Sequence, residues 1–205
     1  MRLGIFGGTF DPVHYGHLLL AERCREECRL DSVAFLPAGL PPHKAAQAIT
    51  PGVHRVRMLE LAIGGHPAFC VDPRELRRTE RCFTVETLEE LRTENPVREL
   101  TFLMGADSLA DFPGWKSPRR ILELAELAAV NRGGTPPPDV SRVLEALGGW
   151  GAGRVRLISI PGVEIASREI RERVRRGKTI RYMTMVDVER YIAEKQLYGR
   201  VTSDE

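Results

Sequence analysis

Residues 7–17 read GGTFDPVHYGH, and they join a short apolar segment to the first helical pattern of the chain. A glycine pair lets the backbone approach a ligand closely, and the helix that follows presents unpaired N–H groups that attract anions. His14 and His17 lie beside that helix start and can therefore face one phosphate. The stretch matches neither GxxxxGK[ST] nor GxGxxG, which disfavours Walker-type NTPases and dinucleotide-binding dehydrogenases. A metal site on the same two histidines is disfavoured because no third ligand is evident in the sequence.

The rest of the chain predicts an α/β fold with a doubly wound parallel sheet. Short apolar runs bounded by Gly, Pro or Asp alternate with longer helical patterns, as in βαβ units. The expected strands span residues 2–6, 32–36, 68–71, 99–104, 125–130 and 155–160. The expected helices span residues 16–28, 51–63, 85–93, 117–122, 140–147, 168–176 and 185–194. A chain of 205 residues fits a single domain, residues 1–205, with a small C-terminal helical portion over about residues 163–205.

Charge and composition disfavour several classes of protein. Thirty Lys+Arg against 28 Asp+Glu leave a net charge of +2, which is too near neutral for a protein that wraps nucleic acid. No apolar run approaches the roughly 18 residues of a membrane span, and the first residues enter a strand with no room for a signal peptide. We therefore expect a cytoplasmic protein whose partners are neither nucleic acid nor membrane. In that compartment we expect four reduced cysteines, Cys24, Cys28, Cys70 and Cys82.

Several motifs resemble one enzyme family. GGTFDPVHYGH resembles the HxGH signature of the nucleotidyltransferase superfamily, and in full it is similar to that of the bacterial nicotinate-nucleotide adenylyltransferases. Further blocks follow in the order of that family and span nearly the whole chain. They are PPHK at 41–44, FTVETL at 83–88, GADSL at 105–109 with Trp115, IASREIR at 165–171, and a closing YI and LY at 191–192 and 197–198. The chain departs from the family at Ala166 and Arg168, where a serine and a threonine are expected, so one or two hydroxyl donors for ATP phosphates are missing.

The resemblance implies a Rossmann-like sheet and a definite reaction. The adenylyl group of ATP is transferred to nicotinate mononucleotide, which gives deamido-NAD and pyrophosphate in NAD biosynthesis. Mg²⁺ is expected as the cofactor, bound mainly through the ATP phosphates and not by metal ligands of the chain. A phosphate monoester has a second pKa of about 6 and is already largely dianionic at neutral pH, so it needs no general base. What the reaction needs is positioning and positive charge, because two polyanions must meet.

The resemblance also assigns residues to these tasks. It gives the catalytic positive charge to His14, His17, Lys44 and Arg171. It gives ATP binding to Gly8, Thr9, Phe10, Gly105, Asp107 and Ser167, and it gives the mononucleotide side to Thr84, Trp115 and Arg132. Thr84 is expected as the N-cap of the helix through Leu88, where backbone N–H groups can receive a carboxylate. Arg168 is expected to reach the β- or γ-phosphate in place of the absent threonine.

Two other functions stay open on the sequence alone. One is a different HxGH adenylyltransferase or cytidylyltransferase, with phosphopantetheine or nicotinamide mononucleotide as the acceptor. The other is a nucleotide-binding regulator without turnover, which the missing hydroxyl donors suggest. The arginines at 74, 77, 78 and 81 alternate with acidic residues, which favours a solvated surface over a site. The sequence leaves formation of a homo-oligomer open.

Overall fold

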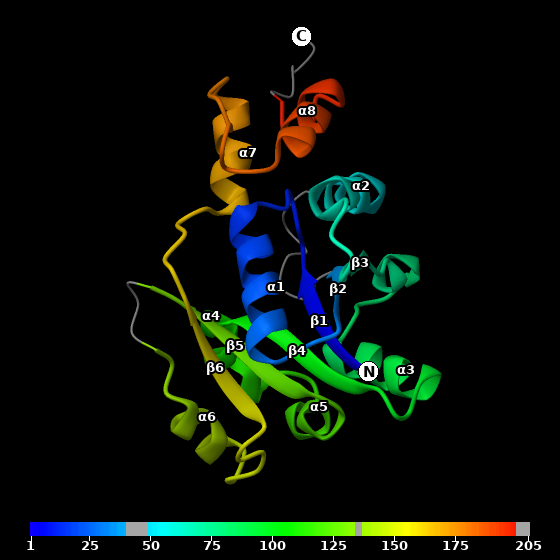
Figure 1. Ribbon diagram of the computed structural model, residues 1–205, viewed down its shortest axis with the longest axis vertical. Helices are drawn as coiled ribbons and strands as arrows, with labels where there is room; N and C mark the ends of the chain where they lie inside the picture. The colour runs from blue at the N-terminus through cyan, green and yellow to red at the C-terminus, as the bar shows by residue number, and fades with distance from the viewer. Residues whose placement is uncertain (40–48, 134–136, 200–205) are drawn as a thin grey trace.

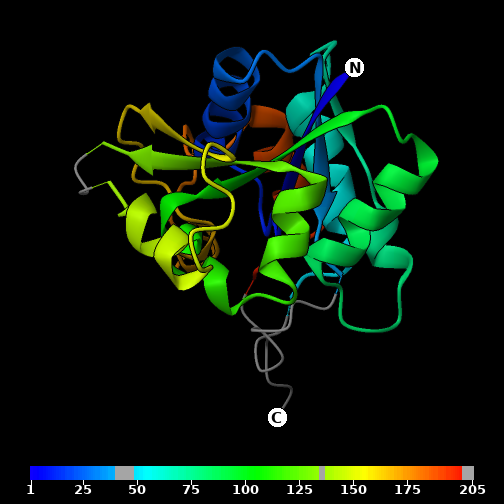
Figure 2. The ribbon, with the colours of Figure 1, turned by 90° about the horizontal axis from the view of Figure 1, so that it is seen from below.

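The computed structural model describes residues 1–39, 49–133 and 137–199, with only the backbone of Arg132. A six-stranded sheet runs through it in the order β3-β2-β1-β4-β5-β6, and every neighbouring pair is parallel. The strands are β1 Arg2–Gly8, β2 Ser32–Pro37, β3 Phe69–Val71, β4 Glu99–Gly105, β5 Glu126–Arg132 and β6 Val155–Ile160. The sheet confirms the expected doubly wound architecture, and Figures 1 and 2 show it flanked by helices on both faces.

The helices include all seven that the sequence predicts. These are α1 Tyr15–Glu27, α2 Gly52–Ile63, α3 Thr84–Glu94, α5 Pro118–Leu124, α6 Val140–Ala146, α7 Ser167–Arg175 and α8 Val186–Glu194. The structure adds α4 Ala106–Asp111 and two 3₁₀ turns, η1 Arg74–Arg77 and η2 Phe112–Gly114. These three are too short for a 3.6-residue pattern to be recognised in the sequence. None of the described helices is long and apolar enough to span a bilayer.

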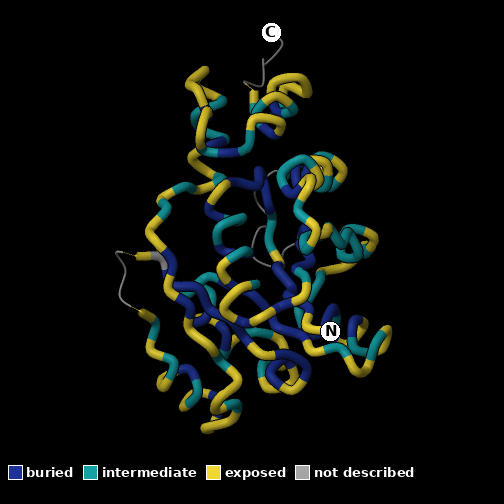
Figure 3. The backbone as a smooth tube through the Cα atoms, viewed as in Figure 1, coloured by how far each residue is buried: buried dark blue, intermediate teal, exposed yellow. Residues whose placement is uncertain are grey.

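Alternating side chains of the strands build a separate core on each face of the sheet. Ile5 and its neighbours pack with the helices α3 and α5, whereas Phe6 and its neighbours pack with α1 and α2. The core that contains Phe6 also contains Ile170 of α7 and Val188 of α8, so the C-terminal helices share this core with α1. Cys24 and Cys28 belong to the same core. Figure 3 shows the buried backbone concentrated in the strands and on the inner faces of these helices.

The sheet order places a change of direction beside β1. The chain first adds β2 and β3 on one side of β1 and then crosses to add β4 on the other side. In doubly wound sheets the connections that leave such a point diverge and open a crevice at the carboxyl ends of the strands. Gly8 ends β1 and Gly105 ends β4, so both of these predicted site residues border the crevice.

Candidate active site

The loop after β1 folds around one buried aromatic ring. Phe10 is 1% exposed, has a left-handed φ of 49°, and packs edge-on against Phe6 and His17 with ring centroids 5.3 and 5.1 Å away. A Cβ at position 8 would lie 2.9 Å from the Phe10 ring, so glycine is required there. A Cβ at Gly7 would meet only Phe102, at an ordinary 3.6 Å. Gly8 and Phe10 therefore shape the loop, whatever contacts they make with ATP.

The two histidines meet at the N-terminus of α1. His14 is the N-cap residue and is 2% exposed, and its ring stacks on that of His17 with centroids 3.7 Å apart. The backbone N–H of His14 donates to Nδ1 of His17 at 3.2 Å. Because Nδ1 accepts this bond, a neutral His17 carries its proton on Nε2 and offers it as a donor. The expected convergence of both imidazoles at a helix N-terminus is therefore present in the structure.

Side chains from distant segments donate to the carbonyl oxygens of this loop. Arg55 of α2 donates to Thr9 at 3.0 Å. The remaining bonds, from the C-terminal portion, are Arg171 Nη1 to Asp11 at 2.6 Å, Ser167 Oγ to Pro12 at 2.8 Å, and Thr184 Oγ1 to Val13 at 2.8 Å. Buried carbonyl groups need such partners, because an unsatisfied one costs about 1–3 kcal/mol. The shape of the loop is thus fixed from α2, α7 and the segment before α8.

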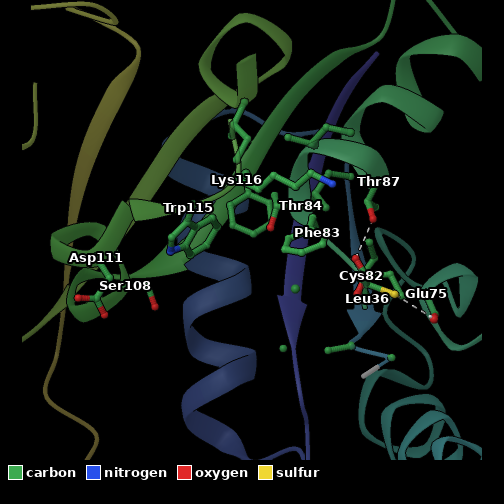
Figure 4. A pocket seen from close by; sticks show the side chains of 18 of the residues that line it. Leu36, Glu75, Cys82, Phe83, Thr84, Thr87, Ser108, Asp111, Trp115 and Lys116 are labelled. Atoms are coloured by element: carbon green, nitrogen blue, oxygen red, sulfur yellow. Dashed lines mark hydrogen bonds between the residues drawn. The ribbon is translucent and has the colours of Figure 1, made fainter. Parts of the chain in front are cut away.

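A cavity of about 620 Å³ opens beside the loop, at the carboxyl ends of β1 and β2. Its wall includes Gly8, Thr84 and Trp115, three of the residues that the sequence assigns to substrates. Trp115 is held edge-on by Phe102 and Phe112, with ring centroids 5.9 and 5.6 Å away. Figure 4 shows the Trp115 and Phe83 rings on one side of the cavity, with Ser108 and Asp111 at one end and Glu75 and Cys82 at the other. A flat aromatic ligand fits this mainly apolar wall.

Thr84 does not take the expected N-cap position. Phe83 is the N-cap of α3, with an extended φ of −113° and ψ of 139°, and Thr84 is the first helical residue. The carbonyl of Phe83 accepts from the N–H groups of Glu86 and Thr87 at 3.1 and 3.3 Å. The prediction was wrong by one position. Thr84 is already a helical residue, so Phe83 takes the N-cap position, although threonine is the better capping residue of the two. The N-terminus of α3 still borders the cavity.

Comparison with known proteins agrees with this geometry. Residues 5–173 match the model of the cytidylyltransferase-like family. The chain is 48% identical over 200 residues to a probable nicotinate-nucleotide adenylyltransferase of Thermomicrobium roseum, covering 98% of this chain and 92% of the relative. A protein of the same description from Symbiobacterium thermophilum is 41% identical over 199 residues, covering 97% and 96% of the two chains. The chain belongs to the nicotinate-nucleotide adenylyltransferases.

Solved structures show the same fold at low sequence identity. The structure of Plasmodium falciparum nicotinic acid mononucleotide adenylyltransferase complexed with APC is similar, with a TM-score of 0.77, 19% identity and 96% of each chain covered. A second structure of that protein, complexed with NaAD, has the same TM-score at 20% identity and covers 96% of this chain and 97% of its own. The adenylyltransferase fold is thus retained where most of the sequence has changed.

The adenylyltransferase motifs near the C-terminus have a contact that the sequence did not indicate. Ser167 and Arg171 were assigned to ATP and to catalysis, and in the structure each donates to a carbonyl of the loop at residues 7–17. Nothing in the sequence pairs these residues with that loop. Arg168 is exposed on α7 and lies beside Arg173 and Arg176 in a shallow surface depression. Its role toward the ATP phosphates stays a prediction.

The remaining predicted residues lie at the strand ends or outside the described part of the chain. Gly105 is the N-cap of α4, and a Cβ built there meets nothing within 4 Å. Asp107 is exposed on the first turn of the same helix. Arg132 ends β5, but its side chain is not among the described residues. Lys44, with the whole PPHK block, also lies outside the described residues, so its role stays a prediction.

The sequence analysis missed a polar network at one end of the cavity. The Thr87 hydroxyl donates to Oε1 of Glu75 at 2.8 Å and accepts from Nη1 of Arg78 at 3.1 Å. Arg78 is 20% exposed and pairs with Glu90 of α3 at 2.7 Å. The interpretation of the arginines as a solvated surface is therefore wrong for Arg78, and also for Arg74, which is 17% exposed and bonds to Glu94 at 2.9 Å. Both glutamates stand on α3, so no pattern within the arginine-containing segment indicated the pairing.

Burial raises the pKa of the Glu75 carboxyl, although the hydrogen bond from Thr87 and the charge of Arg78 oppose the shift. The folded chain then keeps this proton to a higher pH than the unfolded chain does. The contribution of Glu75 to the free energy of unfolding must therefore fall as pH rises from the ordinary pKa range of a glutamate through the raised pKa. Glu75→Gln keeps an oxygen for the Thr87 hydroxyl and does not titrate. We expect this variant to gain stability relative to the unmodified chain as pH rises from about 4 to 8, measured by urea unfolding.

Glu80→Gln is the matched control, because Glu80 is exposed in the same connection. Its stability difference from the unmodified chain should stay flat over the same pH range. A flat difference for Glu75→Gln as well would show that the Glu75 carboxyl titrates alike in the folded and unfolded chains.

Proposed function

We propose that the chain transfers the adenylyl group of ATP to nicotinate mononucleotide and releases deamido-NAD and pyrophosphate. The observation that carries this proposal is the position of Gly8. It belongs both to the loop at residues 7–17, which leads to His14 and His17, and to the wall of the cavity that Trp115 lines. A triphosphate at the loop and a flat ring in the cavity would thus meet beside the end of β1. The descriptions of the relatives support the same reaction.

The reaction requires one bond to form and one to break at a single phosphorus. An oxygen of the mononucleotide 5′-phosphate attacks the α-phosphorus of ATP, and the bond from that phosphorus to the bridging oxygen of the β-phosphate breaks. Pyrophosphate leaves with the electron pair. We propose that ATP enters as its magnesium complex, in which the ion neutralises part of the phosphate charge. Among the residues that the structure describes, no cluster of three or more His, Cys, Asp or Glu could hold a metal ion.

The chain contributes positive charge and fixed geometry to this step. We assign Nε2–H of His17 and the N-terminus of α1 to the transferring phosphate, where preorganised donors stabilise developing charge. His14 supports the His17 ring by stacking on it. Arg171 reaches the loop from α7 and brings a guanidinium to the same region. Lys44 is assigned to the phosphates on the sequence alone.

Binding of the rest of ATP is assigned to groups at the ends of two strands. Gly8, Thr9 and Phe10 would border the triphosphate, together with Ser167 at the start of α7. Gly105 and Asp107 would hold the adenosine ribose, since a carboxylate after a strand can accept from its hydroxyl groups.

The mononucleotide is assigned to the cavity. The indole of Trp115 would stack on the pyridine ring, and base-like stacking is worth about 1–3 kcal/mol. Thr84 begins α3, so its backbone N–H has no acceptor inside the helix and can donate to the nicotinate carboxylate. The ammonium of Lys116 lies on the same wall, 4.2 Å from the centroid of Phe83 and 2.6 Å from Glu86. Arg132 is a further candidate at the end of β5.

Product formation with matched acceptors tests the function. Pyrophosphate release and dinucleotide formation are measured with ATP or CTP as donor, and with nicotinate mononucleotide, nicotinamide mononucleotide or phosphopantetheine as acceptor. We expect the largest kcat/KM with ATP and the acid mononucleotide, because helix N–H groups favour a carboxylate over an amide. Equal values for acid and amide would indicate an amide-tolerant enzyme. Saturable ATP binding without pyrophosphate release would indicate a regulator.

His17→Ala tests the assigned source of transition-state stabilisation. Losing one preorganised donor at developing charge typically costs about 2.7–4 kcal/mol, or roughly 100- to 1000-fold in rate. We expect a loss of that size in kcat, with a much smaller change in ATP binding measured by calorimetry. His66→Ala is the control. His66 precedes β3, at the amino ends of the strands and so on the opposite side of the sheet from the cavity, and its ring lies beside Glu22. A folded His17→Ala variant with turnover within about threefold of the unmodified chain would contradict the assignment.

A further inference from the structure

Asp11 connects three separate parts of the chain. It is 3% exposed in the middle of the loop at residues 7–17. Its Oδ1 accepts from the hydroxyl of Tyr198 at 2.5 Å, and its Oδ2 accepts from the backbone N–H of Thr50 at 3.2 Å. One buried carboxylate thus links the loop at residues 7–17, the residues before α2 and the segment after α8.

Tyr198 is well suited to be a permanent donor. It follows α8 in a left-handed conformation with φ of 63°, and its phenol is half-buried. Burial raises the pKa of the Tyr198 hydroxyl, and the carboxylate of Asp11 raises it further. The hydroxyl therefore keeps its proton, and its bond to an ionised acceptor belongs to the stronger class of hydrogen bonds.

A buried arginine completes the arrangement around Asp11. Arg55 is 3% exposed, and its guanidinium donates to the carbonyls of Thr50 at 2.9 Å and Thr9 at 3.0 Å. Burial lowers the pKa of Arg55, and the negative charge of Asp11 opposes that shift. The buried charges compensate each other, which makes the network costly to break at one point.

The backbone of Asp11 is also bonded to a distant side chain. Its carbonyl accepts from Arg171, and His14 caps α1 three residues later. A shift of Asp11 would move the anchor of Arg171 and the entry to the helix that carries His17. In reactions that depend on positioning, a misplacement of about 1 Å can cost about 100-fold in rate.

We propose that Tyr198 is a positioning residue for adenylyl transfer, which it serves by holding the carboxylate of Asp11. The proposal rests on the proposed function, since it concerns the same loop. Tyr198 acts through Asp11 on the placement of the histidines and Arg171. Its loss therefore affects the transfer step more than binding of either nucleotide. A tyrosine with only a structural role would lower stability and leave the turnover of the folded protein unchanged.

The test is a double-mutant cycle on kcat with Tyr198→Phe, Asp11→Asn and the double variant. We expect Tyr198→Phe to lower kcat by about 10- to 100-fold while both KM values change by less than about threefold. We expect the double variant to be no slower than the slower single variant, because each substitution removes the charge-assisted bond between the Tyr198 hydroxyl and the Asp11 carboxylate. Tyr191→Phe is the matched control, since it removes a hydroxyl bonded to His54 at 2.8 Å in the same C-terminal portion. That control should lose a similar amount of thermal stability and keep the unmodified kcat.

Three results would overturn the proposal: an unmodified kcat in folded Tyr198→Phe, an equal loss in Tyr191→Phe, or effects that add in the double variant. If Tyr198→Phe does not fold, Asp11→Asn decides alone, because a lowered kcat at constant KM supports the proposal and an unchanged kcat overturns it. The unmodified chain is assayed first with every acceptor. A failure of the proposed function then appears as missing product with nicotinate mononucleotide before any variant is compared.

Discussion

The site depends on a loop, residues 7–17, that turns several of its carbonyl groups inward to side chains of α2, α7 and the segment before α8. Inward carbonyl groups lose their bonds to water, so the protein must supply donors. Arg55, Ser167, Arg171 and Thr184 supply them to the loop at residues 7–17. The C-terminal helices share one core with α1, and α7 carries Ser167 and Arg171 to the loop. They hold the loop from the other end of the chain.

The position of the loop in the sheet brings two different surfaces to the end of one strand. β1 lies where the order of the strands changes direction, with β2 on one side and β4 on the other. The histidines follow its end on α1, while the cavity with Trp115 opens toward α3. Positive helix termini and imidazoles on one side suit a polyphosphate, and aromatic walls on the other suit a pyridine ring. The two surfaces thus belong to different faces of the sheet: the histidines to the face covered by α1, and the cavity to the face covered by α3.

Local patterns predicted the strands and the longer helices well, because burial on both faces of a parallel sheet leaves continuous apolar runs in inner strands such as β1, β2 and β4. Long-range hydrogen bonds could not be predicted in this way. The partners Ser167 and Pro12 are 155 positions apart, and no local pattern records that distance. Thr84 was misplaced by one position because capping preference and backbone torsions disagree there. Arg74 and Arg78 were misread because their acidic partners stand on the next helix, α3.

Hydrogen exchange of the loop in the protein without substrates tests most directly whether the C-terminal portion holds it. The amide of His14 donates to His17, and the amide of Tyr15 donates to the carbonyl of Met183 at 3.3 Å. The account predicts that both exchange slowly by NMR before any nucleotide binds. Thr184→Val, which leaves the Val13 carbonyl without its donor, should speed both by about 10-fold or more while the amide of Leu103 in β4 keeps its rate. Exchange of both amides at the rate of an unstructured peptide in the unmodified chain would contradict the account.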